Sequence, residues 1–229
     1  MNAPVRLAID IWSDVMCPWC IIGYKQLQQA LGELKGEIEA DIRWRPFELN
    51  RDMPEEGEDM GQHMLRKYGV PPNRAASNQM AQIAQQAGYE MRYLGEGEEP
   101  PRRIWNTFLA HKLLHWALDA QGPEAQTRLK LALFDAHFQQ RRNMADREVL
   151  LDIAESEGFD REAASAALDD EALSETIRTE EAQALEMGVT AVPMMLVNRR
   201  VMIPGAQDPE TYATTLRRVV ERGLLNPAD

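Results

Sequence analysis

The stretch Asp14-Val15-Met16-Cys17-Pro18-Trp19-Cys20 decides the fold of this chain. An alternating apolar run precedes it at 5–12, and apolar residues recur at three- and four-residue steps from Cys17 to Leu34. The alternation predicts a strand with one buried face, and the longer steps predict a helix. Both cysteines therefore lie where a strand gives way to a helix.

A second strand is predicted after this helix. Gly36 is the expected stop of the helix, because glycine commonly follows the last helical turn. Apolar residues return over 38–49 and predict a strand whose end becomes irregular at Pro46. The first fifty residues thus predict a β–α–β unit.

The rest of the chain divides into a helical block and a short tail. Residues that favour helices predominate from about 60 to 187, with breaks such as Gln-Gly-Pro at 121–123. A strand–turn–strand pattern follows over 192–203, and Asp208 with Pro209 predicts the start of a last helix.

The order β–α–β, helices, β–β–α predicts an α/β fold of the thioredoxin-like class, split by an all-α helical insertion. We assign residues 1–57 and 187–229 to the thioredoxin-like domain. Residues 58–186 are assigned to the helical insertion domain.

Composition and charge narrow the choice of partners. Hydrophobic residues make up 44% of the 229 residues, enough for a core, and the net charge is −12. Nucleic acids and anionic membranes both favour positive charge, so neither is expected as a partner. No apolar stretch of signal-peptide length precedes the first strand, and none approaches the roughly 18 apolar residues of a membrane span. We therefore expect a cytoplasmic protein.

The chain has only two cysteines, three positions apart. A tight pair in a chain without other cysteines is typical of a working redox pair. The free N–H groups and the dipole at a helix N-terminus favour a thiolate, and lower a thiol pKa from about 8.5 to roughly 3.5–7.5. We expect Cys17 to be this nucleophile and Cys20 to resolve the mixed disulfide it forms. Pro18 suits the first helical turn, and Trp19 would shield one side of the sulfurs.

Two other interpretations of the pair are a half zinc site and an inert structural pair. Zinc normally takes four protein ligands. The histidines lie far from the pair in sequence and lack a finger-type spacing, at positions 63, 111, 115 and 137. We expect no metal.

Val192-Pro193 opens the strand that follows the helical block. In a thioredoxin-like core, a cis-proline loop at this point faces the cysteine pair, and cis bonds are largely confined to X–Pro. The spacing favours a cis bond that exposes the backbone of Val192 to a substrate strand beside Cys17. The alternative is an ordinary trans proline at the start of a strand.

Four groups of segments, spread from the first strand to the last helix, match the pattern of a known family. They are 14–20 with Ile22-Gly23, 44–50, Asn106-Thr107 with 110–113, and 188–193 with Gly205-Ala206-Gln207. On these segments the chain resembles the DsbA-like thioredoxin superfamily, and within it the cytoplasmic FrnE-like branch of thiol–disulfide oxidoreductases.

The resemblance implies a thioredoxin fold with an inserted helical domain, Cys17 as nucleophile, Cys20 as resolving cysteine and Pro193 in cis. The same branch is similar to glutathione-dependent 2-hydroxychromene-2-carboxylate isomerases. Those carry Ser where this chain has Cys17, so the presence of both cysteines favours redox work. Ala191 stands where Gly is common, and the second cysteine pair of some relatives is absent, which leaves the partner surface open.

Three further residues are candidates for the site. His111 either hydrogen-bonds near the cysteine pair, where it would stabilise the thiolate or relay a proton, or is a packed helix histidine. Asn106 either binds a substrate backbone or a thiol ligand, or caps the helix that follows it. Glu48 either shuttles a proton for Cys20 or, as we favour, is an exposed residue at a strand end.

The leading hypothesis is dithiol–disulfide exchange with protein or small-molecule disulfides and thiols, with no required cofactor and a direction set by reduction potential. A second is a glutathione-dependent isomerase or transferase, in which the helical block would hold an aromatic substrate. A third is a non-catalytic holdase with a methionine surface of Met16, Met194 and Met195. A homodimer through the helical block is compatible with this sequence.

Overall fold

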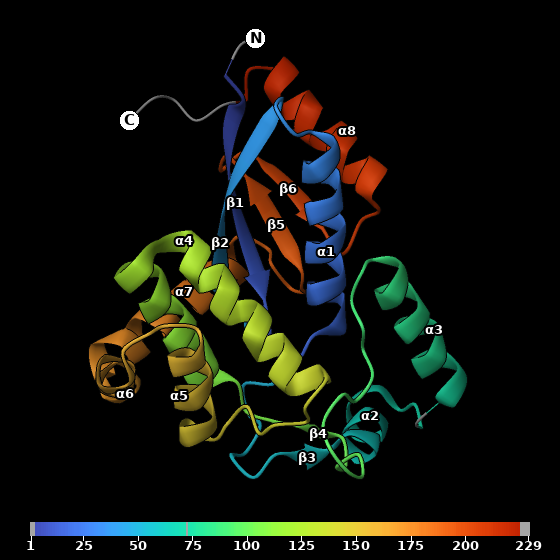
Figure 1. The fold of residues 1–229 in the computed structure, drawn as a ribbon, viewed down its shortest axis with the longest axis vertical. Helices are drawn as coiled ribbons and strands as arrows, with labels where there is room; N and C mark the ends of the chain where they lie inside the picture. Colours follow the sequence, from blue (N-terminus) through green and yellow to red (C-terminus); the bar gives the residue numbers. More distant parts are fainter. Residues whose placement is uncertain (1–2, 72, 225–229) are drawn as a thin grey trace.

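The first fifty residues form the predicted β–α–β unit, which consists of β1 (Val5–Ser13), α1 (Pro18–Glu33) and β2 (Ile38–Pro46) (Figure 1). This computed structural model describes residues 3–71 and 73–224, and the other residues lie outside the description. β2 ends at Pro46, where the sequence predicts an irregular end. β1 and β2 pair in parallel, with Ile9 opposite Ile42.

The cysteine motif sets the start of α1. Cys17 is the N-cap residue, with extended backbone angles of φ −88° and ψ 114°, and Pro18 occupies the first helical turn as predicted. Proline fits there because the N–H group that it lacks would have no partner inside the helix. Gly36, just past the end of the helix, has a φ of 86°, a left-handed conformation that glycine adopts without steric cost.

A helical block lies between β2 and the last two strands. Its longest helix, α4, is broken at Gly122, which has a φ of 82° and lies in the predicted break at 121–123. The block was predicted to be all-α, but it also contains two short paired strands. Arg103 holds them together by donating to the carbonyls of Glu56 and Gly57. Its elements are β3 (Glu58–Asp59), α2 (Met60–Tyr68), α3 (Arg74–Gln86), β4 (Arg103–Ile104), α4 (Phe108–Phe138), α5 (Arg147–Ser156), α6 (Arg161–Asp169) and α7 (Glu171–Glu186).

The chain ends in the predicted β–β–α tail of β5 (Met194–Val197), β6 (Val201–Pro204) and α8 (Pro209–Glu221). The two strands form an antiparallel hairpin, and the four-stranded sheet has the order β2-β1-β5-β6. The Asp208 carboxylate accepts a hydrogen bond from the N–H of Thr211 at 2.8 Å and caps α8, as its position predicts. The fold is the predicted α/β, thioredoxin-like one with a helical insertion.

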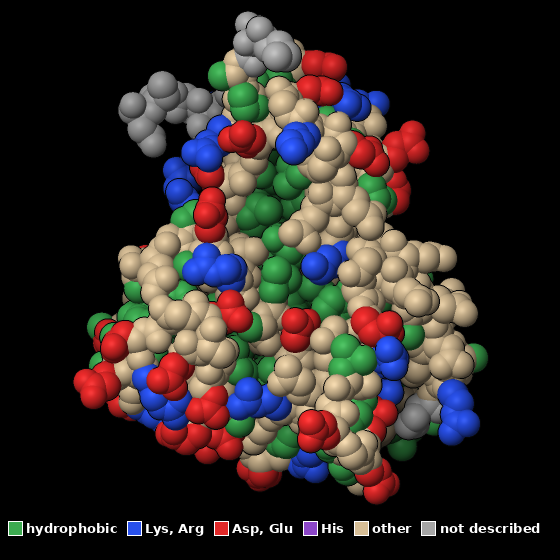
Figure 2. Space-filling view, in the orientation of Figure 1, with side chains coloured by type: hydrophobic (Ala, Val, Ile, Leu, Met, Phe, Trp, Pro, Cys, Tyr) green, Lys and Arg blue, Asp and Glu red, His purple; other side chains and the backbone are tan. Residues whose placement is uncertain are grey.

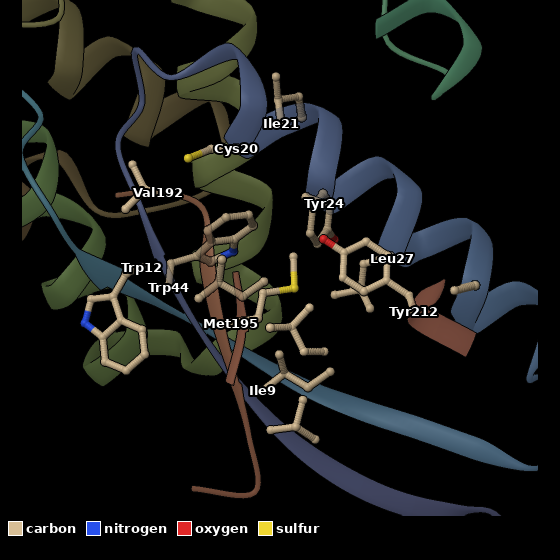
Figure 3. Close-up of a cluster of buried hydrophobic side chains, with 14 of the residues drawn as sticks. Ile9, Trp12, Cys20, Ile21, Tyr24, Leu27, Trp44, Val192, Met195 and Tyr212 are labelled. Carbon is tan, nitrogen blue, oxygen red and sulfur yellow. The ribbon is translucent and has the colours of Figure 1, made fainter. Parts of the chain in front are cut away.

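The main core lies between the sheet and the two helices α1 and α8 (Figures 1 and 3). Alternate residues of the central strand β1, Leu7, Ile9 and Ile11, point into it and are fully buried. Tyr24 and Leu27 of α1 and Tyr212 of α8 complete this face of the core. Among the described residues, no helix combines the length and the apolar composition of a membrane span.

The two halves of α4 are attached to different parts of the molecule. In the first half, the buried Lys112 ammonium donates to the carbonyls of Leu168 and Asp170, at the end of α6, at 2.8 Å each. In the second half, the Gln126 amide bonds both the N–H and the C=O of Trp44 at 2.9 Å. This one side chain therefore takes the place of a neighbouring strand at the edge of β2.

We predict that Gln126→Leu lowers the free energy of unfolding by about 2–4 kcal/mol. The substitution conserves volume but leaves the buried N–H and C=O of Trp44 without partners. Urea denaturation measures the loss. Gln183→Leu, at an exposed position of α7, is the control and should change stability by less than about 0.5 kcal/mol. Equal stability of wild type and Gln126→Leu would contradict the role given to this amide.

Candidate active site

The two cysteines lie one turn apart at the start of α1, and both are free thiols. The N–H of Cys17 donates to the Asp14 carbonyl, and the N–H of Cys20 donates to the Cys17 carbonyl, each at 3.1 Å. These bonds join the end of β1 to the first turn of α1. Both residues are buried, and Cys17, at 4% exposed against 0% for Cys20, is the slightly more accessible of the two.

The loop before β5 lies against Cys17. The peptide bond between Val192 and Pro193 is cis, as predicted. The Cys17 thiol donates to the Val192 carbonyl, with 3.6 Å between sulfur and oxygen. Figure 3 shows Val192 and Cys20 together at the end of the cluster where α1 starts. Residues 175 positions apart thus meet at one site.

Gly23 allows this loop to approach α1. A Cβ at Gly23 would lie 3.3 Å from Pro193 Cγ and from the Cα of Ala206. Few Cβ atoms have contacts this close, so a larger side chain would push α1 and the loop apart. Gly23, Pro193 and Ala206 all belong to the segments on which the sequence resembles its family, and they meet beside Cys20.

Trp19 flanks the pair at the surface. It is 40% exposed, which makes it one of the large apolar side chains that face solvent. Cys17 itself is nearly covered, so the indole of Trp19 is an apolar part of the motif that faces solvent.

A buried lysine from the insertion lies behind the thiols. Lys130 of α4 is fully buried, and its ammonium donates to the Ser13 carbonyl at 3.5 Å. The ammonium lies 5.3 Å from the ring centre of Trp44 and 5.0 Å from that of Phe134. Burial lowers the pKa of Lys130 to about 8, while the charges of Cys20 and Asp14 oppose this.

Asp14 is the buried anion of the same site. Its carboxylate accepts hydrogen bonds from the N–H of Met16 at 3.2 Å and of Leu49 at 2.8 Å. Burial raises the pKa of Asp14, whereas these two bonds and the charge of Lys130 oppose the rise. The cysteine pair therefore has one cation and one carboxylate behind it.

The prediction that the helix start lowers the pKa of Cys17 is wrong, because the pKa of this thiol is raised. The hydrogen bond with Cys20, burial and the nearby Asp14 raise the pKa of Cys17. Burial also raises the pKa of Cys20, but the close Cys17 sulfur, hydrogen bonding with Ser13 and the charge of Lys130 lower it below its ordinary value. Because the two thiols lie close together, the loss of the first proton is a property of the pair and not of either cysteine alone. The resulting negative charge is stabilised by the buried Lys130.

Lys130 was not among the predicted site residues, although the sequence carries a signal for it. Lys130 lies one residue after Leu129, and three and four residues before Leu133 and Phe134, so it belongs to the apolar stripe of the helix. A lysine on a buried stripe is rare unless it has a partner. The pattern indicates a buried cation, but it does not identify the cysteines as its neighbours.

Glu48 is not the exposed strand-end residue that we favoured. It is 6% exposed, because the chain after β2 turns inward against α7. Arg178 of α7 donates to its carboxylate, and the N–H of Glu48 donates to Glu181 at 3.0 Å. Burial and the charge of Glu181 raise the pKa of Glu48 to about 7, and Arg178 counteracts them.

His111 and Asn106 are the two candidate site residues that the helical block supplies. The buried His111 forms no hydrogen bond to either cysteine within the described residues, and burial together with the charges of Lys130 and Arg178 keeps its pKa well below the ordinary value. Asn106 accepts a hydrogen bond from the N–H of Phe108 at 2.9 Å, at the start of α4. These contacts favour the packed-histidine and helix-cap interpretations, and the roles of both residues toward a substrate stay predictions.

The expected methionine surface is largely absent. Met16 and Met195 are buried and Met194 is half-buried. In residues 3–71 and 73–224, no group of three or more His, Cys, Asp or Glu side chains is arranged to hold a metal ion.

Free thiols at the start of a helix that packs on this sheet, with a cis proline against them, place the protein in the thioredoxin-fold class. Within that class, residues 8–217 match the DSBA-like thioredoxin domain, and the chain belongs to that family. Its members are thiol–disulfide oxidoreductases, as the sequence resemblance implied.

Individual proteins are similar to this chain in sequence or in fold. The probable DsbA oxidoreductase SCO1869 of Streptomyces coelicolor is 26% identical with a TM-score of 0.81, over 97% of this chain and 93% of that chain. The uncharacterized protein YwbO of Bacillus subtilis (strain 168) is 28% identical over 89% of this chain and 92% of its own length. The cytosolic disulfide reductase DsbM of Pseudomonas aeruginosa, in its structure with GSH, is 18% identical with a TM-score of 0.62, over 93% of this chain and 99% of that chain.

We predict that Glu48→Gln removes a pH dependence of stability. The pKa of Glu48 is about 7 in the folded protein and about 4.3 when unfolded, so between these values the folded state binds more protons. Stability of the wild type should therefore fall as pH rises from 5 to 8, by about 2–3 kcal/mol relative to Glu48→Gln. Urea denaturation across this range checks it. The exposed Glu186→Gln should keep the wild-type slope, and parallel curves for all three proteins would contradict the prediction.

Proposed function

We propose that the protein is a thiol–disulfide oxidoreductase in which Cys17 attacks the substrate and Cys20 resolves the mixed disulfide. One observation carries this: the more accessible thiol lies at the helix start beside the Val192 carbonyl, and the second thiol lies behind it within reach of Lys130. An extended substrate that pairs with the Val192 backbone would bring its sulfur to Cys17.

The exchange proceeds in two displacements. The thiolate of Cys17 attacks a substrate disulfide, the S–S bond breaks, and the leaving sulfur takes up a proton. The thiolate of Cys20 then attacks the sulfur of Cys17, releasing the second substrate thiol and leaving an intramolecular disulfide. Two electrons pass from the pair to the substrate, and the reverse sequence oxidises a dithiol.

Lys130 and Asp14 would tune this exchange in opposite directions. Lys130 stabilises the thiolate of the reduced pair, and this interaction is lost when the pair forms a disulfide. Stabilising the reduced form makes a pair more oxidising. The negative charge of Asp14 acts against the thiolate and favours the oxidised form.

We also propose that the enzyme is cytoplasmic and FrnE-like, needs no cofactor and uses glutathione as one of its thiol substrates. The cysteine usage of the chain and the likeness to the cytosolic DsbM, whose structure holds GSH, support it.

The first test is insulin disulfide reduction with variants of each cysteine. Cys17→Ser should reduce turnover to the uncatalysed rate. Cys20→Ser should accumulate a mixed disulfide through Cys17 that mass spectrometry detects, because nothing resolves it. No reduction by the wild type, or unchanged turnover by Cys17→Ser, would refute the proposal.

The same variants separate the redox enzyme from a glutathione-dependent isomerase or transferase. Such an enzyme needs one activating group and no resolving thiol. With glutathione and a small aromatic substrate, an unchanged rate for Cys20→Ser would favour that alternative.

The second test concerns Lys130. We predict that Lys130→Met raises the pKa of the cysteine pair by about one unit and lowers its reduction potential by about 30 mV, because the thiolate loses its nearby cation. Alkylation rates against pH and glutathione redox buffers measure the two quantities.

Two control variants distinguish this effect from general damage. Asp14→Asn should shift both quantities in the opposite direction. Lys112→Met removes another buried lysine of α4, which binds the end of α6, and should leave both unchanged even where it lowers stability. Identical titrations for wild type and Lys130→Met would show that Lys130 does not act on the pair.

A further inference from the structure

The hydroxyl of Ser13 is a buried donor that the hydrogen bonds of the fold leave unused. Ser13 is the last residue of β1 and is fully buried. Within the described residues its Oγ has no hydrogen-bond partner, although its carbonyl accepts from the Lys130 ammonium at 3.5 Å. A buried hydroxyl without a partner costs free energy. The packing of the fold therefore gives no reason for a serine at this position.

The acceptor within reach of this hydroxyl is the sulfur of Cys20. Hydrogen bonding with the Ser13 side chain lowers the pKa of the Cys20 thiol, and so does hydrogen bonding with the N–H of Asp14. A neutral thiol is a weak acceptor, whereas an anionic one accepts strong hydrogen bonds. The end of β1 thus presents two neutral donors to one sulfur, and both gain a partner when that sulfur becomes a thiolate.

Cys20 depends on such donors because it is sealed from solvent. Figure 2 shows Lys, Arg, Asp and Glu side chains spread over the surface of the molecule, where solvent screens their charges. The ionisable groups around the pair are Cys17 of α1, Asp14 at the end of β1, Lys130 of α4 and Tyr212 of α8. Lys130 is the cation among them, and the remaining stabilisation of a Cys20 thiolate comes from hydrogen bonds.

The contribution of Ser13 is largest in the mixed disulfide. In the reduced pair the Cys17 thiol also lowers the pKa of Cys20. Once Cys17 has bonded to a substrate sulfur, it has no S–H group to donate. The hydroxyl of Ser13 and the N–H of Asp14 are then the neutral donors left at the sulfur that must attack, in a site where fixed donors act without reorganisation.

We propose that the Ser13 hydroxyl is the hydrogen-bond donor that stabilises the Cys20 thiolate in the step that resolves the mixed disulfide. This inference rests on the proposed function and adds a catalytic residue to its second displacement. In that step the Cys20 thiolate forms a bond to the Cys17 sulfur and the bond from Cys17 to the substrate breaks. The substrate sulfur leaves with the electron pair and takes up a proton, which balances the one that Cys20 lost. Ser13 keeps its own proton throughout.

The first test measures the pKa of Cys20 alone. In a Cys17→Ala background Cys20 is the single thiol of the chain, and, as in the mixed disulfide, no Cys17 S–H lies beside it. Adding Ser13→Ala should raise the pKa of Cys20, followed by thiolate absorbance, by about one unit. Ser174→Ala removes a hydroxyl that binds the Lys112 ammonium of the insertion at 2.8 Å and should leave this pKa unchanged.

The second test separates the two displacements. One equivalent of dithiobis(nitrobenzoate) releases a coloured thiolate when Cys17 attacks it and another when Cys20 resolves the mixed disulfide, so stopped-flow absorbance follows both. Below the pKa of Cys20, Ser13→Ala should slow the second release about threefold and leave the first unchanged, because a roughly tenfold loss of thiolate is partly offset by the greater nucleophilicity of a more basic sulfur. Above that pKa the variant should resolve faster than the wild type, since the anion is then fully formed in both.

Stability distinguishes a reserved donor from a structural one. At about pH 5 both thiols are protonated, and Ser13→Ala should not lower the free energy of unfolding, because its hydroxyl has no partner to lose. Ser174→Ala should lower it, since a buried ammonium loses a hydrogen bond. Urea denaturation compares the two variants.

Three results would each overturn the inference. These are an unchanged pKa of Cys20 in Ser13→Ala, equal slowing of both releases, and a loss of stability at about pH 5 as large as that of Ser174→Ala. The titration decides the inference even if the wild type reduces no insulin, which is the separate result that refutes the proposed function.

Discussion

Two side chains of α4, one helical turn apart, join the helical insertion to the sheet and to the cysteine pair. Gln126 completes the hydrogen bonding of Trp44, and Lys130 places a cation next to the Ser13 carbonyl, behind the thiols. Both are fully buried, so α4 cannot slide along the sheet without leaving polar groups unpaired. The contact that docks the insertion is therefore also the one that places a charge at the redox site.

The features that the sequence predicted correctly depend on short-range rules. The cap and first turn of α1 follow from Cys17 and Pro18, and the strand β1 follows from its alternation. The cis bond before Pro193 followed from the position of that residue in a recognisable fold and from the family resemblance. In each case, a few neighbouring residues or a known topology determine the local structure.

The features that the sequence did not predict depend on which distant segments pack together. Glu48 was expected at the surface, and its contacts with Arg178 and Glu181 of α7 explain its burial. The raised pKa of Cys17 reflects its closeness to Cys20 and Asp14 in a covered site, which no helix-terminus rule includes. Lys130 was visible as a lysine on an apolar stripe, but its neighbours come from β1 and β2, about 85 to 117 residues away in sequence.

The break of α4 at Gly122 changes the direction of the helix without separating its two halves. Before the break, Lys112 fastens the helix to α6, and after it Gln126 fastens the helix to β2. The Gln126 amide also donates to the Leu114 carbonyl at 3.1 Å, and side chains of both halves belong to one buried cluster with α5 and α6. The outer helices and the sheet are therefore mechanically linked across the glycine, so a change in the packing of α5 or α6 has a direct route to the edge of β2.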